Sequence, residues 1–332
     1  MTERIVALLA YDGLQPLDLV GPHEVFASAN QLLDSENRPG PRYRTVVVAR
    51  QPGIIRAHSG LGIAAESWTD VGPIDTLMIP GGLEGRRDGS HADTISWLQA
   101  TAPTVRRLAC VCTGSFIAAD AGLLDGRRVA THWARATRLA REFPALQVDP
   151  EAIYIRDGKV WSSAGVTAGM DLSLALVEDD HGAQLAQLVA RWLVMFLRRP
   201  GGQSQYAAPV WSKAAERAPI RAAQDAVVAD PGADHRVPAL AESVGMSMRS
   251  FQRAFTSEVG EPPARYVERI RVDLARRLLE TEREGVESIA RRSGFGTAET
   301  MRRAFLRHVG VSPDQYRSRF ALTPYVTDEV HR

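Results

Sequence analysis

The feature that most constrains the fold of this chain is an internal repeat near its carboxyl end. The segment LAESVG (240–245) matches IARRSG (289–294) in pattern at an offset of 49 residues. Farther on, FQRAFTSEVGEPPARY (251–266) matches MRRAFLRHVGVSPDQY (301–316) at an offset of 50 residues. A segment that recurs in this way is one structural unit built twice. The repeat therefore predicts two copies of the same small motif.

Each copy has the pattern of a helix-turn-helix motif. A first helix ends in a tight turn at Gly245 or Gly294, and a second helix begins at Ser247 or Thr297. Ser and Thr suit the position before a helix because their hydroxyl oxygen accepts a bond from an unpaired backbone N–H. The pattern predicts two short helices per copy, joined by that turn.

The second helix of each copy separates apolar from polar side chains. The residues that recur four apart, and that we expect to pack inward, are Phe251, Phe255, Met301 and Phe305. The residues left to face outward are Arg249, Gln252, Arg253, Ala298, Glu299, Arg302 and Arg303. The outward faces are the candidates for binding a partner.

Local charge indicates the nature of that partner. Residues 288–320 contain seven arginines against two acidic residues, a balance of +5, although the whole chain carries only +1. Guanidinium groups present flat forks of donors that match phosphates and guanine edges. A solvated face of a helical bundle is the alternative explanation. Two copies of the motif favour double-stranded DNA, such as a promoter or operator, as the partner.

Residues 219–320 resemble the DNA-binding domain of the AraC/XylS family. The family's closing signature stands here as Gly294-Phe295, Ala304-Phe305, Gly310, Ser312-Pro313 and Tyr316-Arg317. The resemblance implies two helix-turn-helix units joined by a long helix, here 264–280, with both second helices entering successive major grooves. It implies DNA contacts from Ser247, Arg249, Gln252, Arg253, Thr297, Ala298, Glu299, Arg302 and Arg303.

The first 180 residues have a different pattern, in which short β-rich runs alternate with helical segments. Buried strands are expected at 5–11, 43–49, 75–82 and 107–112, and a hairpin at 152–163 with a type I′ turn at Asp157-Gly158. A helix over 181–199 is expected to close this part. The alternation predicts an α/β fold with a mainly parallel sheet.

Length, composition and the lengths of the apolar runs argue against a disulfide-rich, secreted or membrane-spanning protein. The 332 residues, 45% of them hydrophobic, suffice for two domains, and the two cysteines, Cys110 and Cys112, lie too close in one expected strand to form a disulfide. We expect them to point to opposite faces, with Cys110 in the core. The apolar runs are too short for a signal peptide or a membrane span. A cytoplasmic protein without membrane contact, metal or cofactor is expected.

Several long motifs in residues 4–195 resemble the DJ-1/PfpI-like domain of GlxA-type AraC regulators. They are DGLQPLDLVGPHEVF, PGG, CVCTGSFIAADAGLLDGRRVATHW and SAGVTAGMDLSLALVEDDHG. In enzymatic relatives a cysteine lies on a sharp strand-to-helix elbow beside an acidic residue, and Cys112 and Asp18 match these positions as the only catalytic candidates. A helix N-terminus can lower the pKa of such a thiol, and Gly81-Gly82 can offer N–H donors to an anion.

The sequence departs from those enzymes directly after the cysteine. A histidine commonly follows it there, whereas here the position is Thr113. His132 is a candidate substitute base, and a structural histidine is the simpler interpretation. Nucleophilic catalysis needs an activating base, so we interpret the elbow as the wall of a ligand pocket. The expected pocket residues are Asp18, Gly81, Gly82, Cys112, Thr113, His132, Trp133 and Val166.

Together these patterns predict a transcription regulator that is not an enzyme. We expect a flavodoxin-like domain over residues 1–199, which senses a small metabolite, an amino acid or amine, and forms a homodimer. A linker is expected over residues 200–218 and a DNA-binding domain over residues 219–321. Residues 322–332 are expected to form a tail. RNA polymerase is a further candidate partner. A cysteine-dependent hydrolase, a glyoxalase-like enzyme or a thiol redox sensor, fused to a DNA-binding domain, is the alternative.

Overall fold

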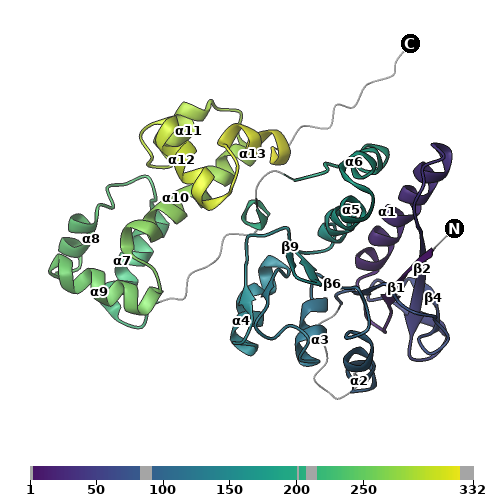
Figure 1. The fold of residues 1–332 in the computed structure, drawn as a ribbon. Helices are drawn as coiled ribbons and strands as arrows, with labels where there is room; N and C mark the ends of the chain where they lie inside the picture. Colours follow the sequence, from purple (N-terminus) through teal and green to yellow (C-terminus); the bar gives the residue numbers. More distant parts are fainter. Residues whose placement is uncertain (1–2, 83–91, 200–201, 207–214, 322–332) are drawn as a thin grey trace, which may run out of the picture. The chain divides into compact units, whose positions relative to one another are not determined.

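A computed structural model describes residues 3–82, 92–199, 202–206 and 215–321. The chain divides into two compact units, 1–203 and 204–332, and each is described by itself (Figure 1). The boundary between the units falls inside the predicted linker. The predicted tail, 322–332, lies outside the described residues.

The first unit is built on an eight-stranded sheet of order β3-β4-β2-β1-β5-β6-β10-β9. Its neighbouring strands are parallel except for β3 with β4 and β9 with β10. The strands are β1 (Glu3–Leu9), β2 (Arg42–Ala49), β3 (Gly53–Arg56), β4 (Gly62–Ser67), β5 (Thr76–Ile79), β6 (Arg107–Val111), β9 (Tyr154–Asp157) and β10 (Val160–Ser163). A separate parallel pair joins β7 (Arg128–Val129) to β8 (Gln147–Val148). The prediction of a mainly parallel sheet is confirmed.

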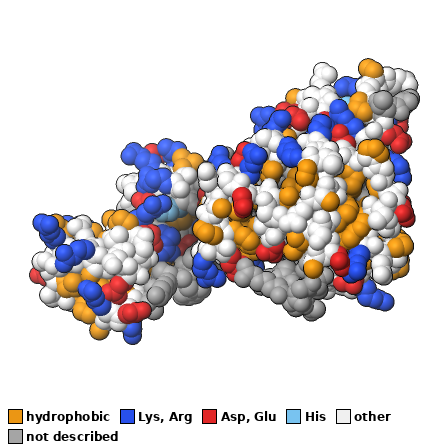
Figure 2. Space-filling view, turned by 60° about the horizontal axis from the view of Figure 1, so that its bottom comes forward, with side chains coloured by type: hydrophobic (Ala, Val, Ile, Leu, Met, Phe, Trp, Pro, Cys, Tyr) orange, Lys and Arg blue, Asp and Glu red, His pale blue; other side chains and the backbone are white. Residues whose placement is uncertain are grey.

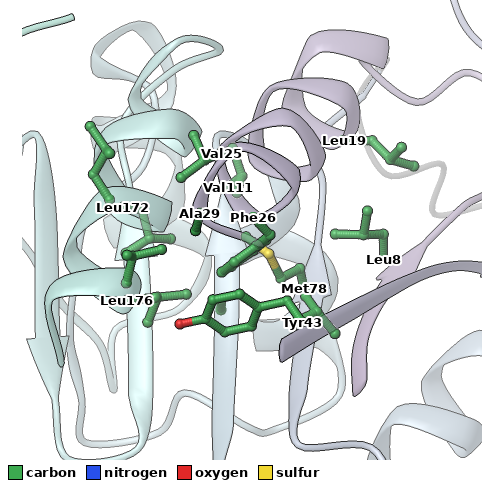
Figure 3. Close-up of a cluster of buried hydrophobic side chains, with 14 of the residues drawn as sticks. Leu8, Leu19, Val25, Phe26, Ala29, Tyr43, Met78, Val111, Leu172 and Leu176 are labelled. Carbon is green, nitrogen blue, oxygen red and sulfur yellow. The ribbon is translucent and has the colours of Figure 1, made fainter. Parts of the chain in front are cut away.

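Helices cover both faces of the sheet, which is why its central strands are continuous apolar runs. One layer consists of α1 (Pro16–Ser35), α5 (Ala168–His181) and α6 (Ala183–Trp192), and the other of α2 (Ala92–Thr101), α3 (Gly114–Asp120) and α4 (Trp133–Glu142) (Figure 1). Figure 3 shows the core under α1 and α5, where Phe26, Leu172 and Leu176 lie against Val111 of the sheet. A second core fills the opposite face.

Two sequence predictions about this unit are wrong in detail. The helix expected over 181–199 begins only after Gly182 and ends at Trp192, and the left-handed φ of Val194 (55°) prevents its continuation. The hairpin is present, but its loop residues are Gly158 and Lys159, and only Gly158 has a positive φ (62°). That pattern is typical of a type II′ turn, which needs Gly at its first central position, rather than type I′.

The second unit is helical. Its helices are α7 (Ala218–Ala229), α8 (Val237–Ser243), α9 (Met248–Val259), α10 (Pro263–Thr281), α11 (Val286–Arg292), α12 (Ala298–His308) and α13 (Pro313–Phe320). A short 3-10 turn (Gln203–Gln205) precedes them. The pairs α8–α9 and α11–α12 are the two predicted helix-turn-helix motifs, and α10 connects them (Figure 1).

The repeat in the sequence produces the same aromatic contact twice. In the core of the first helix-turn-helix motif, Phe255 packs edge-on against Tyr266, with ring centroids 5.3 Å apart. In the core of the second motif, Phe305 packs edge-on against Tyr316, with ring centroids 5.9 Å apart. All four side chains are fully buried. The predicted inward packing of the aromatic positions is confirmed.

Charged side chains of both signs lie on the face of the molecule that Figure 2 draws. Figure 2 shows basic, acidic and apolar side chains mixed over the visible face, in keeping with a net charge of +1. Within the described ranges, no helix combines the length and the apolar run that crossing a membrane requires.

The second aromatic core gives a direct test of the helical unit. Phe305 is fully buried, so we expect Phe305→Ala to lower the free energy of unfolding of this unit by about 3–5 kcal/mol. Phe305→Leu should cost less because it leaves a smaller cavity. Denaturant unfolding of the full chain, followed by circular dichroism, measures both. An alanine variant as stable as the wild type would contradict the packing described here.

Candidate ligand cavity and DNA-binding faces

The strand-to-helix elbow predicted at Cys112 is present. β6 ends at Val111, Cys112 has a left-handed φ of 55°, and α3 begins at Gly114. A Cβ on Gly114 would lie 2.1 Å from the Ile79 carbonyl oxygen, so only glycine fits this close approach. The Thr131 hydroxyl donates to the Cys112 carbonyl at 2.8 Å and helps to hold the strained residue.

The same elbow explains why the two cysteines face different cores. Residues two apart in a regular strand share a face, so the opposite orientation we predicted does not follow from strand geometry. It arises because the strand ends at Val111 and the chain turns at Cys112. Cys110 then lies in the core on the α3 side of the sheet, as expected, and Cys112 contacts the core on the α1 side.

The glycine N–H groups expected to receive an anion are already engaged. The N–H of Gly81 donates to Oδ2 of Asp18 at 2.9 Å, and the N–H of Gly82 donates to Oγ1 of Thr113 at 3.0 Å. Thr113 in turn donates to the Gly82 carbonyl at 3.2 Å. The expected anion hole is therefore filled by side chains of the protein itself.

The electrostatics of the elbow oppose a thiolate. Burial, and then the nearby Asp18 carboxylate, raise the pKa of Cys112 to about 11. Burial also raises the pKa of Asp18 to about 7, although hydrogen bonds from the Gly81 N–H and the Cys112 thiol act in the opposite direction. The lowering of the thiol pKa that a helix N-terminus can produce does not prevail here, because desolvation outweighs it. The thiol is protonated at neutral pH.

A cavity of about 460 Å³ opens at the carboxyl ends of the parallel strands. Open α/β sheets bind ligands at this edge. Its wall comprises Gln15, His58, Gly82, Cys112, Thr113, His132, Ala134, Arg135 and Val166. These residues follow β1, β3, β5, β6, β7 and β10, so the sheet topology gathers them from across residues 15–166.

His132 has a defined protonation state in this wall. Its Nδ1 accepts from the backbone N–H of Ala134 at 3.2 Å, which caps α4. Burial, and then the positive charge of Arg135, lower the pKa of His132. The ring is therefore neutral with its proton on Nε2. In that tautomer neither nitrogen is available to take a proton from Cys112, so the structural interpretation of His132 is favoured over a catalytic base.

The structure gathers only part of the predicted pocket. Gly82, Cys112, Thr113, His132 and Val166 line the cavity. Asp18, Gly81 and Trp133 do not: Asp18 is 1% exposed and lies below the wall, where it binds Gly81.

The sequence analysis missed four lining residues, Gln15, His58, Ala134 and Arg135. Gln15 carries a signal that was available, because it is a polar residue in the turn between β1 and α1, whereas Arg135 lies in the first turn of α4. His58 lies in the loop between β3 and β4, two strands that were not predicted.

The two helix-turn-helix motifs have the predicted local geometry. Gly245 and Gly294 have positive φ angles of 67° and 81° in the turns. Ser247 accepts from the Ser250 N–H at 3.3 Å, and its counterpart Thr297 accepts from the Thr300 N–H at 3.2 Å. The caps fix where α9 and α12 begin, and with that the faces the two helices present.

The outward faces of α9 and α12 are those predicted. Their exposed residues include Arg249, Gln252, Arg253, Glu299, Arg302 and Arg303, whereas Ala298 is half-buried. On α12, Glu299 forms ion pairs with Arg302 at 2.7 Å and Arg303 at 2.9 Å. Among the residues that the structure describes, no cluster of His, Cys, Asp or Glu is arranged to hold a metal ion.

Comparisons with known proteins found a family match within each of the two units. Residues 3–179 match the DJ-1/PfpI family and residues 240–319 match a helix-turn-helix domain. The chain is similar to the HTH-type transcriptional regulator Rv1931c of Mycobacterium tuberculosis, with 38% identity over 75% of this chain and 96% of that protein. It is also similar to the HTH-type transcriptional regulator GlxA of Rhizobium meliloti, with 27% identity over 89% of this chain and 91% of the relative.

The chain is also similar to an enzyme. Isonitrile hydratase of Pseudomonas putida shares 30% identity over 55% of this chain and 75% of the enzyme.

The fold and the paired motifs define a transcription regulator with an AraC-type DNA-binding domain fused to an α/β domain. The chain belongs to the DJ-1/PfpI family, in the group of regulators that includes GlxA.

The thiol chemistry of the elbow is testable. In a Cys110→Ala background, we expect Asp18→Asn to increase the rate of Cys112 alkylation by iodoacetamide at pH 8 by about threefold or more, because the carboxylate raises the thiol pKa. The wild-type rate should continue to rise with pH up to about 11. A wild-type rate that levels off near pH 8.5, about where an ordinary thiol ionises, would show that the thiol is not perturbed.

Proposed function

We propose that this regulator binds a small metabolite in the cavity of its α/β unit and that this binding controls promoter recognition by the helical unit. The observation that carries the proposal is a cavity whose cysteine is not activated. A protonated Cys112 beside a neutral His132 suits binding better than nucleophilic catalysis. A homodimer formed through the α/β unit and contact with RNA polymerase belong to the same proposal.

The chemistry of the cavity wall narrows the class of effector. His132 offers an Nε2–H donor, Arg135 supplies a positive charge, and Gln15 has a side-chain amide. Among the described lining residues none is acidic. A carboxylate group on the effector complements this wall, so an amino acid fits through its carboxylate. A simple amine fits less well, because Asp18, the acidic residue expected to pair with an amino group, does not line the cavity.

For promoter recognition we propose that α9 and α12 each enter a major groove. The proposed contacts are Ser247, Arg249, Gln252 and Arg253 from the first motif and Thr297, Ala298, Glu299, Arg302 and Arg303 from the second. Exposed arginines beside a capped helix start support this assignment, since residues near the start of a recognition helix reach base edges. Ligand binding shifts the regulator only if it favours one arrangement of the two units over another.

A second candidate function is a cysteine-dependent hydration reaction. The similarity to isonitrile hydratase and the contact between Asp18 and Cys112 favour it. Cys112→Ala separates the two functions. Retained effector binding and retained promoter response support the regulator alone, whereas turnover of an isonitrile that is lost in the variant supports the enzyme.

The effector class can be tested by thermal-shift measurements on the full chain with a panel of small carboxylates and matched amines. A ligand that binds only the folded state raises its melting temperature. We expect carboxylates to raise the melting temperature more than the amines do. The rise caused by carboxylates should be smaller in Arg135→Gln and unchanged in Cys112→Ala. Shifts from the amines alone would contradict the proposed chemistry of the wall. No shift with any compound would count against a metabolite sensor.

The DNA contacts can be tested at Arg253. We expect Arg253→Ala to weaken binding to a selected duplex by about 1–3 kcal/mol if the side chain reads a base edge. Fluorescence anisotropy titrations at fixed salt, with selected and random duplexes, measure the difference. Equal losses on both duplexes would assign Arg253 to phosphate binding instead.

A further inference from the structure

The two recognition helices carry different charges at equivalent positions. The offset of 50 residues between the copies aligns Arg249 with Glu299, Gln252 with Arg302, and Arg253 with Arg303. The outward face of α9 therefore bears two positive charges and a neutral amide, whereas that of α12 bears two positive charges and one negative charge. The duplication has preserved the cores and changed the chemistry of the contact faces.

The carboxylate of Glu299 engages both arginines of its helix. Its Oε2 accepts from Nε of Arg302 at 2.7 Å, and its Oε1 accepts from Nη2 of Arg302 at 2.9 Å, which makes a bidentate pair. Oε1 also accepts from Nε of Arg303 at 2.9 Å. The Glu299 side chain is 50% exposed, so the carboxylate remains accessible from outside. Residues 299, 302 and 303 share one face because three- and four-residue spacings are neighbours on a helix.

The equivalent residues of α9 are not held in this way. Within the described part of the chain, no ion pair or side-chain hydrogen bond engages Arg249, Gln252 or Arg253. Their side chains are exposed. The first motif thus presents donors that are ready for phosphates and bases, whereas the second presents arginines restrained by a carboxylate.

We propose that Glu299 determines the base preference of the second helix-turn-helix motif. Its carboxylate, held by Arg302 and Arg303 in the free protein, accepts a hydrogen bond from a cytosine amino group in the major groove. The inference rests on the proposed entry of α12 into that groove.

Two physical consequences distinguish this role from that of an ordinary surface ion pair. A carboxylate only accepts hydrogen bonds, and in the major groove cytosine presents its N4 amino group as a donor, so a C·G pair satisfies it. The same negative charge is repelled by phosphates and keeps two guanidinium groups from neutralising them. Glu299 therefore lowers affinity for DNA in general while it favours one base pair.

The test uses the full chain and two variants, Glu299→Gln and Glu299→Ala, with Asp225→Asn on α7 as a matched control. Asp225 is exposed, and its substitution removes the same charge at another place in the unit. Duplexes selected from a random library by the wild type, their single-position variants, and a random duplex are titrated at several salt concentrations. Melting temperatures confirm that all four proteins are folded.

For both Glu299 variants we expect tighter binding to random DNA and a steeper dependence of log K on log salt, by about 0.9 for each additional phosphate contacted. We also expect discrimination at one C·G position to fall about tenfold, while the control keeps wild-type behaviour. Unchanged slope and unchanged preference, or a steeper slope with preference retained, would overturn the proposal. If the wild type selects no duplex, the proposed DNA contacts fail instead.

Discussion

The helical unit depends on one helix that belongs to both of its cores. The first half of α10 contributes Tyr266 and Val267 to the core of the first motif, and the second half contributes Ala275 and Leu279 to the core of the other. Each motif is too small to bury its apolar face alone. Because neither can move without disturbing α10, the spacing of α9 and α12 is set by packing. At 1.5 Å per residue, the 19 residues of α10 span about 28 Å, comparable to the roughly 34 Å between successive major grooves.

In the α/β unit, the strained elbow at Cys112 shapes one corner of the cavity. This corner is formed by the left-handed Cys112, the close approach at Gly114 and the hydrogen bonds that Asp18 and Thr113 accept from the glycine N–H groups. In such a corner a thiolate and free N–H donors would support nucleophilic catalysis. Here the thiol is protonated and the donors are engaged, so the corner contributes shape and polarity to the cavity wall.

Much of the helical unit could be predicted from the sequence, because its signals are local. The aromatic positions recur with helical spacing, and the caps at Ser247 and Thr297 act on N–H groups three residues away. The cavity was harder to predict, because contacts between distant residues define it. The hydrogen bond from the Gly81 N–H to Asp18 spans 63 residues, and Gln15 and Arg135 line one cavity only because of the order of the strands. The thiol pKa could not be predicted either, since burial is a property of the folded chain.

We infer that one chain presents two recognition helices at a fixed spacing. Hydroxyl-radical footprinting of the full chain on a duplex selected from a random library tests it most directly. We expect two protected stretches on one face of the duplex, with centres about 10 to 10.5 base pairs apart. A single protected stretch, or two whose spacing varies between selected duplexes, would contradict it.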